Sequence, residues 1–174
     1  MDLETLKLDL NGLNDGLTSL SFDLDDSFFD AVEAPEVSKG KVHVDIDIVR
    51  TDGDFFSLAF RGNGMVIVPC DRCLEDMEQP IEFEQRLNAK FGREYSEDDD
   101  LVTVAEDEGI LDVAWFIYEF IDLAIPIRHV HAPGKCDPAM IRALEEYSAA
   151  RSGEDSEPSV DPRWAALSNL KIDD

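Results

Sequence analysis

Three cysteines and one histidine are the side chains in this sequence best suited to bind a metal ion. Cys70 and Cys73 form a Cys-x-x-Cys pair at the end of an apolar segment, so two thiolates can bind one soft metal from a single turn. His131 and Cys136 follow in a loop that contains proline and glycine, with four residues between them. Three cysteines and one histidine are the ligand set of a closed structural zinc site, which leaves no coordination position for water. The sequence therefore predicts structural zinc, provided that the fold brings the two pairs together.

Two other interpretations of the cysteines stay open. Reduced thiols that pack as small hydrophobic residues fit the sequence as well as zinc ligands do. A redox pair of the thioredoxin type is less favoured, because it needs a βαβ context and a helix that opens at the first cysteine. His129 is a less favoured replacement for His131 as a ligand. The sequence contains no serine-nucleophile motif, phosphate-binding glycine loop or metalloprotease helix, so it does not indicate an enzyme.

The charge of the chain indicates what kind of partner it can attract. There are 40 acidic residues against 15 lysine and arginine residues, which gives a formal net charge of -25. Such a surface disfavours broad contact with a phosphate backbone and attracts a basic protein, of which ribosomal proteins are one plentiful class. The alternative interpretation of the acidic charge is that it only keeps the protein soluble. A direct RNA-binding module would need five basic residues to gather in one patch: Arg61, Arg72, Arg86, Lys90 and Arg93.

Alternation of apolar and polar residues predicts a mostly antiparallel sheet. Residues 41–48 alternate strictly, and a turn separates them from an apolar run at residues 55–60, which together indicate a β-hairpin. The run Gly62-Asn63-Gly64 predicts another turn, followed by a short strand at residues 65–68 that pairs with residues 81–87. Three further segments are predicted as an edge strand at residues 6–10, a solvated loop at residues 92–100 and a strand at residues 101–105.

Two helices are predicted in the second half of the sequence. Asp112 can cap a largely buried helix that runs to about Ala124, and Pro126 stops it. Asp137 followed by Pro138 is typical of an N-cap and a first helical residue, so another helix starts there. The predicted fold class is α+β: an antiparallel sheet, either open or curled towards a barrel, packed by one buried helix.

Residues 1–150 are assigned to one α+β domain. The position of residues 1–40 within it is left open, and one interpretation is that they are peripheral. Residues 151–161 are rich in Ser, Glu, Asp and Pro, which predicts a flexible acidic linker within a helical and partly disordered tail at residues 151–174. A short amphipathic segment after the linker carries three apolar side chains at spacings of three, Trp164, Leu167 and Leu170. Such an apolar face either folds back or docks on a partner, so these three are the candidate partner-binding residues.

The sequence begins with Met-Asp-Leu-Glu and shows neither a basic nor an apolar leader region. The longest apolar stretch, residues 113–125, is interrupted by acidic residues and is shorter than the ~20 residues of a membrane span. Three cysteines cannot all pair within one chain, so a disulfide framework is not expected. We therefore expect a cytoplasmic protein that makes no membrane contact.

Four segments, in order, resemble the YceD family of large ribosomal RNA subunit accumulation proteins. They are Cys70-Asp71-Arg72-Cys73-Leu74, the stretch Asp112 to Pro126, His131 with Cys136, and Trp164 to Lys171. The resemblance covers about residues 66–171 and implies a role in the accumulation or processing of 23S ribosomal RNA. In many bacteria the family's gene lies beside that of the large-subunit protein L32, which makes L32 a candidate partner.

No catalytic residues are established for the YceD family, so the resemblance implies none in this chain. The function that we expect is that of a non-enzymatic ribosome-assembly factor. It would capture a basic large-subunit protein, or a pre-ribosomal particle, through its acidic surface. A direct RNA-binding module is the first alternative, and a cysteine-dependent redox enzyme is the second.

Overall fold

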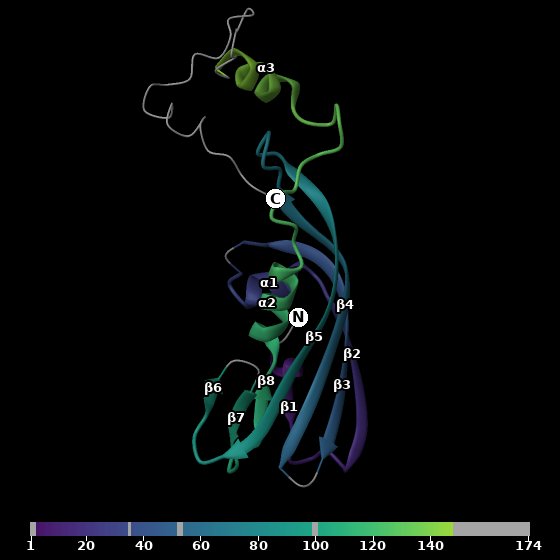
Figure 1. Cartoon of the computed structure of the whole chain (residues 1–174), viewed down its shortest axis with the longest axis vertical. Helices are drawn as coiled ribbons and strands as arrows, with labels where there is room; N and C mark the ends of the chain where they lie inside the picture. The colour runs from purple at the N-terminus through teal and green to yellow at the C-terminus, as the bar shows by residue number, and fades with distance from the viewer. Residues whose placement is uncertain (1–2, 35, 52–53, 99–100, 148–174) are drawn as a thin grey trace, which may run out of the picture.

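The computed structural model describes residues 3–34, 36–51, 54–98 and 101–147. Figure 1 shows one tall curved layer of long strands, with α1, α2 and the short strands β1 and β8 on one side of it. The helix α3 lies beyond one end of this layer. The elements in chain order are η1 (Leu3–Leu6), β1 (Lys7–Asp9), β2 (Gly16–Leu24), α1 (Asp26–Ala31), β3 (Lys39–Thr51), β4 (Phe55–Pro69), β5 (Asp76–Gly92), β6 (Ser96–Asp98), β7 (Leu101–Ala105), β8 (Ile110–Asp112), α2 (Ala114–Leu123) and α3 (Pro138–Tyr147).

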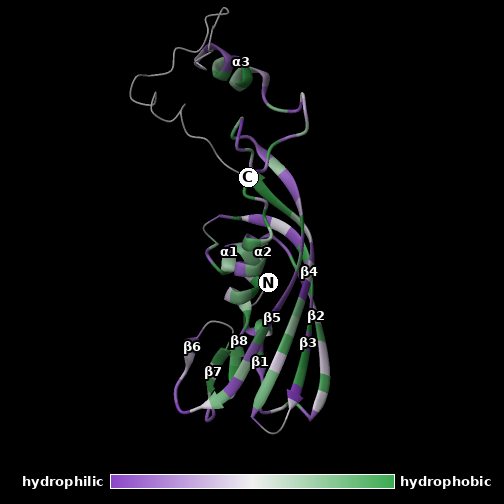
Figure 2. Cartoon of the chain, in the orientation of Figure 1, coloured by the Kyte–Doolittle hydropathy of each residue, from purple (hydrophilic) through white to green (hydrophobic). Residues whose placement is uncertain are grey.

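The main sheet has six strands in the order β2-β3-β4-β5-β7-β6. All neighbouring strands are antiparallel except β5 and β7, which are parallel, and β1 pairs with β8 in a separate two-stranded sheet. Figure 2 shows hydrophobic and hydrophilic residues alternating along the long strands, as a sheet with one packed face requires. The predicted α+β class is confirmed, and the sheet stays open between the edges β2 and β6 instead of closing into a barrel.

The predicted turn at Gly62-Asn63-Gly64 is wrong, because β4 runs without a break from Phe55 to Pro69. Both glycines are instead positions at which a neighbouring group comes too close for a side chain. A Cβ atom on Gly62 would lie 2.3 Å from the ring of Phe83, and one on Gly64 would lie 2.2 Å from the carbonyl oxygen of Lys41. Glycine inside a strand often marks such a close approach rather than a turn.

Other expectations about the strands hold in part. The edge strand expected at residues 6–10 is β1, and the strand expected at residues 101–105 is β7, although its parallel pairing with β5 was not predicted. The expected solvated loop at residues 92–100 contains the exposed strand β6. The strand expected at residues 81–87 is the middle of β5, which continues for several residues on both sides.

The core lies between the packed face of the sheet and the two helices α1 and α2. Buried side chains of α1 (Phe28, Phe29) and α2 (Ile117, Ile121) enter this core, and the ring of Phe120 stacks edge-on against a phenylalanine of β4. The first forty residues also contribute to it through side chains that are buried: Leu6, Leu8, Leu10, Leu24, Phe28, Phe29 and Val37. The described part of residues 1–40 therefore contributes side chains to the core.

The helix α3 begins at Pro138, directly after its predicted capping residue Asp137, whereas α2 begins at Ala114, one residue later than capping by Asp112 predicts. The Asp112 carboxylate accepts a hydrogen bond from the Ala114 N–H at 3.0 Å. The Asp137 carboxylate accepts bonds from the N–H groups of Ala139 and Met140, at the start of α3. These bonds satisfy N–H groups that a helix leaves unpaired in its first turn.

Some predicted features cannot be compared with the fold. The linker at residues 151–161 and the three apolar residues of the tail lie outside the described residues. Among the helices in the described ranges, none has both the length and the apolar content that a membrane crossing requires.

The close approach at Gly64 gives a stability test of the uninterrupted strand β4. Gly64→Ala is expected to lower the free energy of unfolding by about 1–3 kcal/mol, because backbone atoms, which cannot move aside easily, surround the added methyl group. Urea unfolding followed by circular dichroism measures this change. Asn63→Ala on the exposed side of the same strand is the control and should change stability by less than about 0.5 kcal/mol. Equal stability of the two variants would contradict the close approach of the β3 backbone to Gly64.

Candidate metal centre

The Cys-x-x-Cys pair lies in the turn that joins β4 to β5. Cys70 N–H donates to the carbonyl oxygen of Glu75, and Leu74 N–H donates to the carbonyl oxygen of Cys70, each at 2.9 Å. Within this turn Leu74 adopts a left-handed backbone conformation with φ of 62°. This conformation is uncommon for a residue with a side chain and costs free energy. The turn directs both cysteine side chains inward, where Cys70 and Cys73 are buried.

The second half of the centre returns to this turn from α2. Two hydrogen bonds between Asp71 and His129 join the segments: Asp71 N–H donates to the His129 carbonyl oxygen at 3.0 Å, and His129 N–H donates to the Asp71 carboxylate at 2.8 Å. The imidazole Nε2 of His129 also lies 3.5 Å from the same carboxylate. His129 therefore helps to join the two segments, and the histidine that enters the cluster is His131.

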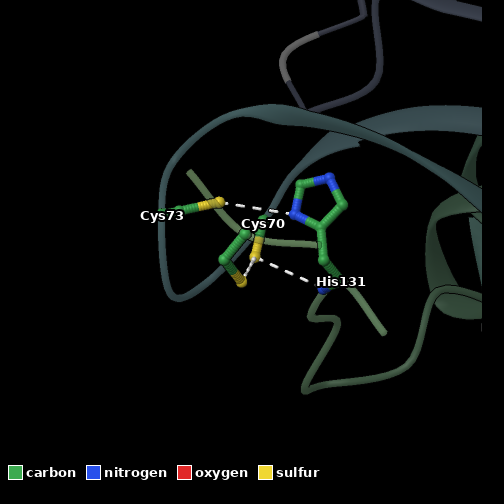
Figure 3. Close-up of side chains that lie close together, drawn as sticks. Cys70, Cys73 and His131 are labelled. Atoms are coloured by element: carbon green, nitrogen blue, oxygen red, sulfur yellow. Dashed lines mark hydrogen bonds between the residues drawn. The ribbon is translucent and has the colours of Figure 1, made fainter. Parts of the chain in front are cut away.

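The structure brings together the four residues that the sequence proposed as ligands. One potential ligand atom from each of Cys70, Cys73, His131 and Cys136 lies within 4.8 Å of every other. The Cys70 and Cys136 sulfurs are 3.9 Å apart. The Cys73 sulfur is 3.3 Å from Nδ1 of His131, a contact that Figure 3 shows. Tetrahedral zinc with usual bond lengths would separate two sulfurs by roughly 3.8 Å, and sulfur from nitrogen by roughly 3.5 Å. The cluster could therefore hold one metal ion with little rearrangement.

Backbone groups around Cys70 favour its thiolate form. Burial raises the pKa of the thiol, but N–H groups of His131 and Arg72 donate to its sulfur, each at 3.4 Å, and bring the pKa to about 6. At Cys136, burial and the neighbouring cysteines raise the pKa to about 11. Three thiols this close cannot all lose their protons unless a cation compensates their charge. The centre thus suits a soft divalent cation.

The alternatives for the cysteines can be compared with this geometry. All three are free cysteines. The Cys-x-x-Cys pair lies in a turn between antiparallel strands, and no helix among the described elements opens at Cys70. This differs from the βαβ setting in which thioredoxin-like pairs are found. The convergence of a histidine and a third cysteine on the pair favours metal binding over buried unreactive thiols.

The basic residues of the alternative RNA-binding interpretation extend along the whole β4–β5 hairpin, from Arg72 at its turn to Arg93 beyond its other end. Individual cations have acidic neighbours. Arg61 forms an ion pair with Asp47 at 2.8 Å, and Arg93 borders the same hollow as two acidic residues, Glu106 and Asp107. The described residues therefore do not join all five cations, Arg61, Arg72, Arg86, Lys90 and Arg93, in one positive patch.

Comparisons with known proteins identify a family over most of the chain. The family described as "Large ribosomal RNA subunit accumulation protein YceD" matches residues 58–171. The chain belongs to the YceD family. It is similar to "Uncharacterized protein YlbN" of Bacillus subtilis (strain 168), with 32% identity over 119 residues, which covers 68% of each chain. No solved structure matches the chain significantly.

Two features of the centre were not predicted from the sequence. The bonds between Asp71 and His129 depend partly on backbone groups, which every residue has and no motif reveals. The left-handed conformation of Leu74 was also missed, because glycine and asparagine are the usual residues at such positions. The location of Asp71 between the two cysteines was the only available hint of its role.

The Asp71 carboxylate gives a test of how the two halves are positioned. Asp71→Ala should weaken zinc binding by about 10- to 100-fold although all four ligands remain, because His129 and the following segment lose an anchor. Competition with a zinc-binding dye measures the affinity. Glu75→Ala removes the same charge from the same turn and should leave the affinity nearly unchanged. Equal losses in both variants would mean that the turn's charge, and not the hydrogen bond, matters.

Proposed function

We propose that this YceD-family protein is a non-enzymatic factor that supports accumulation of 23S ribosomal RNA and production of the large ribosomal subunit. It would act in the cytoplasm by binding a basic protein of that subunit. The observation that carries the proposal is a net charge of -25 in a chain whose family is described by accumulation of the large ribosomal RNA. Such a charge accelerates association with a cationic protein and opposes close contact with bare RNA. Protein L32 is the first candidate partner, and a pre-ribosomal particle is the wider alternative.

The distribution of cations supports a protein partner over a direct RNA contact. A basic patch would have to collect positive charge on one surface to offset the field of the whole chain. The ion pair of Arg61 with Asp47 and the acidic neighbours of Arg93 reduce the positive potential at these positions. We therefore keep the RNA-binding module as the alternative function.

We further propose that the four-residue cluster holds zinc with a structural role. Cys70, Cys73, His131 and Cys136 would fill the four coordination positions of the ion, so no position would remain for a reacting water molecule. The metal would tie the segment that follows α2 to the β4–β5 turn. The helix α3 begins at Pro138, two residues after Cys136, so the bond from Cys136 to the metal would also fix where α3 starts.

The tail would add an apolar contact to the electrostatic attraction. Trp164, Leu167 and Leu170 recur at spacings of three, as they would on one face of a helix that forms on binding. Aromatic and aliphatic anchors of this kind often dominate the energy of an interface, whereas surrounding charges mainly set the rate and orientation of encounter.

The zinc proposal predicts about one zinc ion per purified chain, because the four ligands form one closed site. Cys73→Ser should reduce the bound zinc strongly and lower the thermal midpoint of unfolding, since metal binding contributes to folded-state stability. Elemental analysis and thermal unfolding with and without a chelator measure both effects. His43→Gln removes a histidine outside the cluster and should keep the zinc. Metal-free wild-type protein from zinc-supplemented cells would contradict the proposal.

The partner proposal predicts that immobilised full-length protein binds purified L32 with strong dependence on salt. Affinity should fall on the order of tenfold or more between about 0.05 and 0.5 M salt, because exposed charges are screened. Replacing Trp164, Leu167 and Leu170 by alanine should weaken binding at every salt concentration and leave the salt dependence intact. Ile110→Ala, at an exposed apolar side chain outside the tail, is the control. Binding that is insensitive to salt, or tight binding to protein-free 23S RNA, would contradict the proposal.

A further inference from the structure

The strand β2 is the long free edge of the main sheet. It pairs with β3 over nine residues, and no segment within the described ranges is hydrogen-bonded to its other side. The opposite edge is very different, because β6 has only three residues, two of which are the acidic Glu97 and Asp98. Short and charged edges are a common protection against unwanted strand pairing. One edge of this sheet is therefore protected, whereas the other is open.

The register of the sheet identifies the backbone groups that β2 leaves free. Gly40 N–H, in β3, donates to the side chain of Asp26 and not to β4, so the even-numbered residues of β3 direct their backbone groups towards the β2 side. Because β2 and β3 pair antiparallel with even residues opposite even ones, the odd-numbered residues of β2 direct their N–H and C=O groups away from β3. These residues are Leu17, Ser19, Ser21 and Asp23.

The side chains of β2 do little to block a further strand. Its nine residues contain one charged residue and neither lysine nor proline, and the register with β3 continues without a bulge. On the core side Leu20 and Phe22 are only half-buried, so the apolar layer continues to the edge without full cover. On the other side Ser19 and Ser21 donate hydrogen bonds to Asp47 and Asp45 of β3.

The charge around this edge favours a cationic strand over a second copy of the chain. Residues 15–51 contain nine acidic residues against three lysine and arginine residues. Asp45 and Asp47 lie on the exposed face beside β2, and hydrogen bonds from Ser19 and then Arg61 hold the pKa of Asp47 below its ordinary value. Two chains that each carry a net charge of -25 repel one another, whereas lysine or arginine on an added strand would meet these carboxylates.

We infer that β2 accepts an extended segment of the basic partner as an added strand at the edge of the six-stranded sheet. This inference rests on the proposed function and specifies where and how the partner binds. The added segment alternates basic and apolar residues. Its apolar side chains continue the layer formed by Leu20 and Phe22, and its basic side chains lie on the face of Asp45 and Asp47. Backbone hydrogen bonds to the odd-numbered residues of β2 fix its register.

A matched pair of variants at Ser21 tests the edge. Ser21→Pro removes one outward N–H and leaves the β2–β3 ladder intact, since proline is tolerated on the free side of an edge strand. Ser21→Ala loses the same hydrogen bond to Asp45 but keeps the N–H. The probe is a nine-residue peptide that alternates lysine and valine, and its binding to the full chain is measured by fluorescence anisotropy. A peptide with the same composition, but with all lysines before all valines, is the composition control.

Ser21→Pro should weaken binding of the alternating peptide by about tenfold or more, whereas Ser21→Ala should bind like wild type. The block peptide should bind more weakly than the alternating peptide. Urea unfolding of both variants verifies that each is folded. Equal binding by the two variants, or equal binding of the two peptides, would overturn the inference. Either result would show that binding depends on charge and not on strand pairing.

The remaining outcomes identify a different occupant or separate this inference from the proposed function. Protection of the Ser19 and Ser21 amides from hydrogen exchange in the free monomer would assign the edge to the chain's own tail. A dimer that Ser21→Pro dissociates would assign it to a second copy, and either finding overturns the inference. If Ser21→Pro still captures L32 like wild type, the edge inference fails and the proposed function stands. If wild type captures no large-subunit protein, the proposed function itself fails.

Discussion

The pairing of β4 with β5 is the interaction on which both the core and the candidate metal centre depend. The two strands pair from Phe55 with Lys90 to Pro69 with Asp76, and the turn at the end of this ladder carries Cys70 and Cys73. Near the middle of the ladder Gly62 lets the Phe83 ring lie directly against the strand, where it also approaches Phe120 of α2. The same hairpin therefore positions two parts of the structure. It contacts the helix that packs the core, and it carries the two thiols that the segment after that helix approaches.

The route of the chain explains how residues distant in sequence meet at this turn. The helix α2 packs across the sheet and ends before Pro126, and the following residues extend back to the β4–β5 turn. The bonds between Asp71 and His129 join the two segments next to the four potential ligands. A metal ion bound there would add a strong link to a place where the polypeptide has few buried contacts, since α3 beyond it has no buried residues. Most of the stabilisation from such an ion would thus fall on the return segment and not on the sheet.

Features that depend on local pattern were predictable, and those that depend on tertiary contacts were not. Strict alternation at residues 41–48 and the capping residues Asp112 and Asp137 specify their elements through interactions within a few positions. The four candidate ligands could be selected from the sequence because cysteine and histidine are rare in this chain. Gly62 and Gly64 were misinterpreted because the usual meaning of two close glycines is a turn, whereas their cause here is the proximity of Phe83 and of the β3 backbone. The parallel pairing of β5 with β7 likewise has no local pattern that distinguishes it.

Charge and strand pairing would contribute different properties to partner binding. A net charge of -25 acts over the distance of the ionic atmosphere and attracts any cationic protein, so it cannot by itself select one partner or one orientation. Backbone groups on the free side of β2 recur at every second residue and act only at hydrogen-bond distance, which fixes direction and register. The added strand would have to alternate basic and apolar residues in one register. A shift by one residue would place basic side chains against Leu20 and Phe22 and apolar ones beside Asp45 and Asp47. Under this proposal, specificity would come from the edge and the speed of encounter from the charge.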